Sequence, residues 1–152
     1  SLINEKTYHP VIEEISISGK RGVFSTFTLT YVIARTCRQY EIDYPKGLYR
    51  GGNPIDLWRK TGIKYLTYTP KKGVAFVQQH RQIEDQGHCG YLVGGANSNG
   101  FFPTIEGSIS DVAKYRFDRD MNGTVTKKLI GFVDVTQAVV DEIKKEKNGT
   151  TT

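Results

Sequence analysis

Long apolar runs, internal repeats and metal-binding motifs are all missing from this chain. No apolar stretch approaches the roughly 18 residues that cross a bilayer, so we expect no membrane span. No repeat of about 20–50 residues is visible, which excludes a solenoid or a propeller. The two cysteines are not in the close spacings of zinc sites, so we expect no metal.

The composition is that of one folded domain. The 152 residues include 38% hydrophobic residues, nine Tyr and seven Phe, enough to bury a core. Sixteen Gly and a single Met favour strands and turns over a helical bundle. We therefore expect a single domain over residues 1–152, with 148–152 as a frayed tail.

The net charge is +5 and the sequence pI is about 9.2, which helps a protein approach anionic partners. The charge is scattered, however. The densest basic run, residues 144–147, has the character of a solvated helix end. Charge alone therefore favours a basic surface and does not identify a nucleic-acid site.

The pattern of strands and helices indicates an α+β fold. The strongest expected strand is Val23–Arg35, which is rich in β-branched and aromatic residues. The other expected elements are short: strands at 48–50 and 128–135, helices at 54–60, 74–86, 110–115 and 136–147, a loop at 87–100 and an extended segment at 101–104. Asn53 is expected to cap the helix that Pro54 begins.

One arginine and one segment that contains a cysteine are the first candidates for chemistry. Arg50 ends a short strand before two glycines and a helix that starts at Pro54, an arrangement suited to phosphate but equally to a structural ion pair. Gln86-Gly-His-Cys89-Gly is similar to segments of papain-like and viral chymotrypsin-like cysteine proteases. The papain-like nucleophile would fall on Leu92, and a two-barrel protease needs a longer chain, so Cys89 reads better as half of a disulfide.

The order of several short motifs resembles ADP-ribosyltransferase toxins of the cholera, heat-labile enterotoxin and pertussis type. Tyr49-Arg50-Gly resembles their first motif, the segment ending in Thr104 their Ser-Thr-Ser strand, and residues 129–133 the strand that follows. The segment around Glu14 resembles the one that carries their catalytic glutamate. Glu14 precedes Arg50 here, so the resemblance implies a circularly permuted, compact split β-sandwich with short flanking helices.

The resemblance implies a site for NAD⁺ as substrate. Glu14 would stabilise the oxocarbenium-like transition state as nicotinamide leaves, and Thr104 would orient Glu14. Arg50 would hold the pyrophosphate. His80 would contact the adenosine-side ribose or the phosphates, and Tyr49, Tyr65 or Phe102 would stack on nicotinamide. Glu14→Gln is expected to abolish NAD⁺ turnover while leaving the fold intact.

The function implied is that of a secreted mono-ADP-ribosyltransferase or NAD glycohydrolase. Its partners would be NAD⁺, a macromolecular acceptor in a target cell and a receptor-binding or second toxin subunit. The resemblance also implies that Cys37 and Cys89 form a disulfide, and two Asn-Gly-Thr triplets agree with secretion. Pro103 and Ile12 depart from the motifs of the family.

Two alternatives remain open. One is a secreted basic ribonuclease that uses His80, Arg50 and a Glu. The other is an inactive binding module on the same fold.

Overall fold

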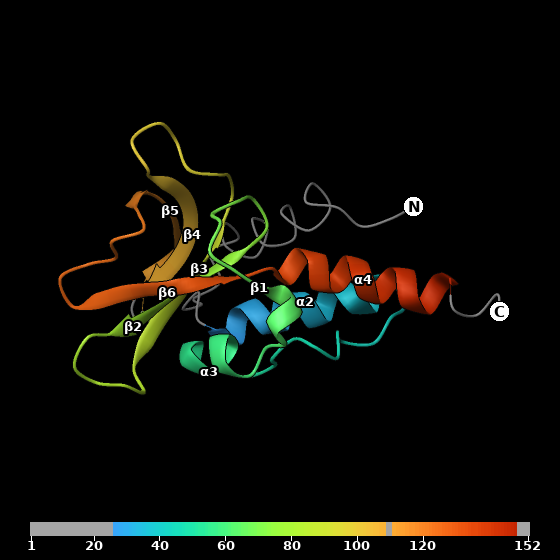
Figure 1. Cartoon of the computed structure of the whole chain (residues 1–152). Coiled ribbons are helices and arrows are strands. Elements are labelled where there is room, and N and C mark those ends of the chain that lie inside the picture. Colours follow the sequence, from blue (N-terminus) through green and yellow to red (C-terminus); the bar gives the residue numbers. More distant parts are fainter. Residues whose placement is uncertain (1–25, 109–110, 149–152) are drawn as a thin grey trace.

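Helices lie on one side of a six-stranded antiparallel sheet in the computed structural model, which describes residues 26–108 and 111–148 (Figure 1). The strand order is β1-β6-β2-β3-β4-β5. The architecture is α+β, as predicted. In chain order the elements are α2 (Thr26–Gln39), α3 (Pro54–Arg59), the 3₁₀ helix η1 (Ile63–Tyr65), β1 (Leu66–Thr67), β2 (Ala75–His80), β3 (Gly87–Leu92), β4 (Phe102–Ser108), β5 (Asp111–Arg119), β6 (Lys127–Val133) and α4 (Val135–Asn148).

The segment predicted as the strongest strand is a helix. Residues 26–35 of the expected strand lie in α2, while 23–25 are outside the described residues. The buried residues Leu29, Val32, Ile33 and Thr36 recur at the spacing of one helix face. Burial of that face against the sheet outweighs the strand propensity of β-branched residues, which amounts to less than about 1 kcal/mol per residue.

Three predictions in the sheet are also wrong. The helix expected over 74–86 is replaced by β2 at 75–80, and the loop over 87–100 contains β3. Residues 111–115 of the helix expected at 110–115 lie in β5, and residue 110 is outside the described residues. Both faces of the first half of β2 are buried, so residues 74–77 form a short continuous apolar run that periodicity does not distinguish from a helix. The strand expected at 48–50 is absent, because these residues form a turn and an irregular segment before α3.

Local sequence predicted the remaining elements well. The Asn53 side chain caps α3 by accepting hydrogen bonds from the backbone N–H groups of Ile55 and Asp56, and Pro54 occupies the first turn. The extended segment at 101–104 enters β4, and the strand predicted at 128–135 is β6. The C-terminal helix predicted at 136–147 is α4.

The two faces of the sheet have different environments. The larger core packs α2, α3 and α4 against one face, which Val77, Cys89 and Ile105 share. Figure 1 shows α2 and α4 running beside each other on that side. The opposite face carries a smaller cluster that includes Phe76 and Phe102. The candidate site lies on this second face.

Candidate active site

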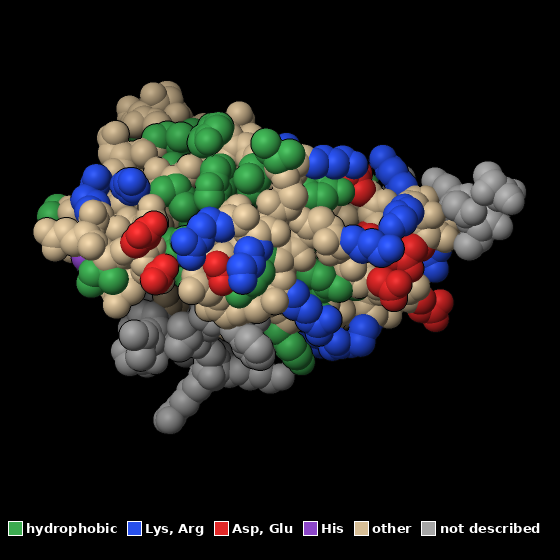
Figure 2. Space-filling view, turned by 60° about the horizontal axis from the view of Figure 1, so that its bottom comes forward, with side chains coloured by type: hydrophobic (Ala, Val, Ile, Leu, Met, Phe, Trp, Pro, Cys, Tyr) green, Lys and Arg blue, Asp and Glu red, His purple; other side chains and the backbone are tan. Residues whose placement is uncertain are grey.

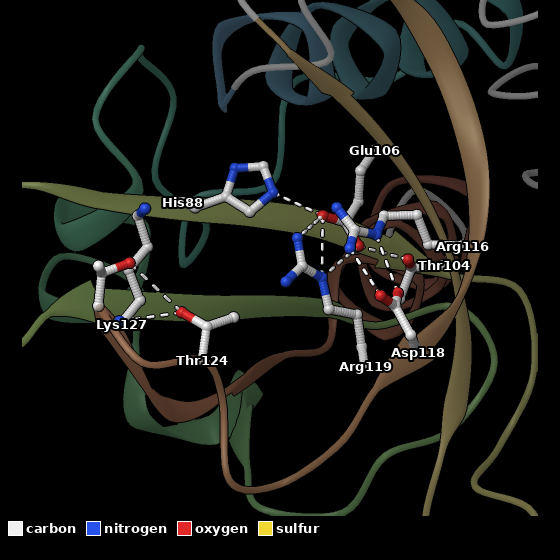
Figure 3. Close-up of polar contacts among 9 residues, drawn as sticks. His88, Thr104, Glu106, Arg116, Asp118, Arg119, Thr124 and Lys127 are labelled. Atoms are coloured by element: carbon white, nitrogen blue, oxygen red, sulfur yellow. Dashed lines mark hydrogen bonds and ion pairs between the residues drawn. The ribbon is translucent and has the colours of Figure 1, made fainter.

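A histidine and a glutamate from neighbouring strands form a close pair on the second face of the sheet. His88 of β3 places Nε2 2.6 Å from Oε1 of Glu106 on β4 (Figure 3). The His88 side chain is 25% exposed, whereas that of Glu106 is only 3% exposed. The pair therefore joins a buried carboxyl group to an imidazole that solvent can reach.

The carboxyl group of Glu106 receives hydrogen bonds on both oxygens. Arg119 of β5 donates from Nη2 to Oε1 at 2.7 Å and from Nε to Oε2 at 2.9 Å, and the Thr104 hydroxyl donates to Oε2 at 2.5 Å. Burial alone raises the pKa of Glu106, but the hydrogen bonds from His88, Arg119 and Thr104 outweigh it and lower the pKa to about 2. Glu106 is therefore ionised at neutral pH.

An aromatic ring and a glycine position the His88–Glu106 pair. The Phe76 ring of β2 meets His88 edge-on at 5.7 Å between centroids, and the Arg119 guanidinium lies 5.8 Å from the centre of the same ring. Gly90 leaves the space that Glu106 fills, since a Cβ there would collide with the Glu106 stem and with Phe76. The absence of a side chain at Gly90 thus allows Glu106 to reach His88 beside it.

The arrangement defines what the imidazole can do. An ionised carboxylate only accepts hydrogen bonds, so it selects the His88 tautomer with the proton on Nε2. Nδ1 then carries a lone pair, and it has no hydrogen-bond partner among the described residues. A solvent-accessible imidazole held in one tautomer by a buried carboxylate has the properties of a general base.

Two residues predicted for NAD⁺ binding lie beside this pair, in different surroundings from those expected. Thr104 is fully buried, and its hydroxyl orients Glu106. Phe102 is 1% exposed and packs against Phe76 and Phe132. Phe102 therefore belongs to the apolar cluster and offers no free ring face for stacking.

Tyr49 and Arg50 lie on the other side of the sheet. Tyr49 packs against the larger core, and its hydroxyl accepts a hydrogen bond from the Asn53 backbone N–H. The exposed Arg50 places its guanidinium 5.2 Å from the centre of the Tyr44 ring. Arg50 and Thr104 are thus separated by the sheet and do not meet in one cleft.

His80 ends β2 and stabilises the turn that follows. Its Nδ1 accepts hydrogen bonds from the backbone N–H groups of Gln82 and Ile83. Glu14, the predicted catalytic carboxylate, lies outside the described residues, as does Ile12.

Both cysteines are free in the structure, so the expected disulfide is not formed there. Cys37 lies in the larger core within α2, and Cys89 of β3 places Sγ 3.2 Å from the Thr26 hydroxyl oxygen at the start of α2. Burial is the main factor that raises the pKa of each thiol to about 12. The two thiols are consequently in their protonated, unreactive form at neutral pH.

Within the described part of the chain, no group of three or more His, Cys, Asp or Glu side chains is arranged to hold a metal ion. In the same residues no helix combines the length and apolar character that crossing a membrane requires.

Glu106 and Arg119 were not among the residues predicted from sequence, and His88 was noted only for its neighbour Cys89. Sequence did contain one indication, because Thr104 and Glu106 are two residues apart and share a face of any strand through them. That indication becomes useful only when residues 87–92 are recognised as the neighbouring strand.

Comparisons with known proteins assign no family to this geometry. No protein-family model matches the chain, and no curated protein matches its sequence.

Proposed function

We propose that this protein is a hydrolase in which His88 is the general base and Glu106 orients it. The observation that carries the proposal is the 2.6 Å contact between His88 Nε2 and the carboxylate of Glu106, beside an Nδ1 that has no hydrogen-bond partner among the described residues. A water molecule whose proton passes to Nδ1 would attack the substrate, and the same nitrogen would return the proton to the leaving group. Glu106 would stabilise the imidazolium formed between these steps.

The charges around His88 favour a neutral carbonyl substrate over a phosphodiester. Arg119, which contacts the pair directly, already holds Glu106 with three hydrogen bonds and is only 11% exposed. Arg116 on the same strand is paired with Asp118. On the face of the molecule that Figure 2 displays, Lys and Arg side chains lie among Asp and Glu side chains. The ribonuclease alternative depends on cations that bind phosphate, so an ester or amide of a carboxylic acid suits this site better.

The attacking group in this proposal is water. The Thr26 hydroxyl at the start of α2 contacts Cys89, which faces the larger core on the opposite side of the sheet from His88, so Thr26 does not supply the nucleophile.

The test is hydrolysis of p-nitrophenyl acetate and of a peptide p-nitroanilide by the wild type, His88→Gln and Glu106→Gln. General base catalysis is worth about 10²–10⁴-fold, so His88→Gln is expected to lower kcat/KM by at least about 10²-fold. His80→Gln is the matched control, because His80 lies on the adjacent strand and serves a turn. Unchanged turnover in His88→Gln, or an equal loss in His80→Gln, would refute the proposal.

A second proposal keeps the NAD⁺ chemistry and the ADP-ribosyltransferase-like split sandwich that the sequence resemblance implies, together with secretion and a macromolecular acceptor. One described contact supports it, because Thr104 orients a glutamate as expected, although that glutamate is Glu106. Release of nicotinamide from NAD⁺ tests this proposal. Release that Glu14→Gln abolishes would support it, whereas no release by the wild type would end it.

A further inference from the structure

Gln78 is a buried polar residue next to His88 whose amide oxygen has no partner. In the β2–β3 pairing Gln78 lies directly opposite His88, so both side chains emerge on the same face of the sheet. Gln78 is 1% exposed, and its Oε1 forms no hydrogen bond among the described residues. The unpaired oxygen therefore belongs to the cross-strand neighbour of the candidate base.

An unpaired buried amide oxygen is costly for a folded protein. Leaving such a group without a partner destabilises the folded state, and an apolar side chain of the same size would avoid this loss. Its neighbours on this face are Phe76 on the same strand and His88 on the next, and neither donates a hydrogen bond to it. The described residues therefore leave this oxygen without a donor, and the N–H group of a ligand would supply one.

We propose that Gln78 binds the amide group of the substrate. This inference rests on the hydrolase proposed above and adds the class of substrate. Oε1 needs a donor, and the N–H of a secondary amide is one that an ester lacks. The Gln78 NH₂ group can donate to a carbonyl oxygen at the same time. A substrate that enters along the exposed side of His88 would thus present an amide to Gln78 and its scissile carbonyl to the water that His88 deprotonates.

Binding of a small amide tests this inference without any need for turnover. The probe is N-methylacetamide, with methyl acetate as the ester control, added to the ¹⁵N-labelled full chain. The side-chain NH₂ resonances of Gln78 are identified by their loss in Gln78→Met. We expect these resonances to shift with N-methylacetamide and to remain in place with methyl acetate. No shift, or an equal shift with both probes, overturns the inference.

Stability distinguishes a ligand-binding residue from a structural one. Gln78→Met removes the unpaired oxygen at nearly constant volume, so its Tm should equal or exceed that of the wild type. The matched control is Gln79→Met on the same strand, where Nε2 donates to the Glu84 carbonyl at 2.9 Å. A Tm below that of the control would mean that Gln78 has a structural partner, which overturns the inference.

Turnover then separates this inference from the proposed function. Gln78→Met should lower kcat/KM for the p-nitroanilide about tenfold, the value of one hydrogen bond, and change the ester within about twofold. An equal loss on both substrates overturns the role in amide selection. If His88→Gln retains activity while the Gln78 resonances respond to the amide, the hydrolase proposal fails and the amide site stands. If His88→Gln is inactive and Gln78→Met hydrolyses both substrates normally, only the amide site fails.

Discussion

Acid should weaken the fold through Glu106, and the size of the effect follows from its environment. The pKa of Glu106 falls from an ordinary 4.5 to about 2 in the folded protein, because the hydrogen bonds donated by His88, Arg119 and Thr104 outweigh the cost of burial. A carboxyl group with a lowered folded pKa contributes stability above its unfolded pKa, and this stability is lost as pH falls through the folded value. At about 1.4 kcal/mol per pKa unit, the contribution is about 3 kcal/mol. Loss should begin near pH 4.5 and continue to pH 2 and below.

Urea unfolding of the wild type and Glu106→Gln across this pH range measures the contribution. Other carboxylates titrate in both proteins, so the difference between their free energies of unfolding isolates Glu106. We expect that difference to shrink by about 3 kcal/mol between neutral pH and full protonation of the carboxyl group. Parallel curves would refute the reasoning. If the glutamine variant does not fold, Thr104→Val removes one donor, and the smaller pKa depression should reduce the loss of stability in acid.

Three further predictions concern the capping residue, the glycine beside the pair and the thiols. Asn53→Ala should lower the free energy of unfolding by about 1 kcal/mol in chemical denaturation, because two backbone N–H groups of α3 lose their acceptor. Gly90→Ala should destabilise the fold by about 1–3 kcal/mol and reduce turnover by displacing Glu106, and wild-type stability would contradict this. Cys37 and Cys89 should react with a thiol reagent only after unfolding, and should yield two free thiols without a reductant, whereas no reactive thiol would establish the disulfide.

The elements predicted from sequence are those whose ends are specified locally. Asn53 and Pro54 define the start of α3 through capping and a fixed φ, so neither depends on distant residues. The C-terminal helix has an amphipathic pattern, with Val135, Val139 and Ile143 buried in the larger core. In these segments local propensity and the final packing agree.

The elements predicted wrongly are those in which packing overrides propensity. The β-branched residues of α2 favour a strand, but the spacing of Leu29, Val32 and Ile33 fits a helix face buried on the sheet. In β2 the alternation is hidden because Phe76 and Val77 are both buried, on opposite faces. Only the neighbouring strands determine which pattern is realised, and the sequence of the segment itself does not contain them.

The candidate site depends on the same non-local information. His88 and Glu106 are 18 positions apart in the sequence and meet because β3 and β4 pair antiparallel, with Tyr91 opposite Ile105. The contact also needs Gly90, whose missing side chain leaves space for the glutamate stem. Once residues 87–92 are read as a loop, none of these relations is visible, and a histidine before a cysteine indicates no partner. A correct strand assignment there would have placed an imidazole and a carboxylate on one face of the sheet, so the error in secondary structure and the missed site have one cause.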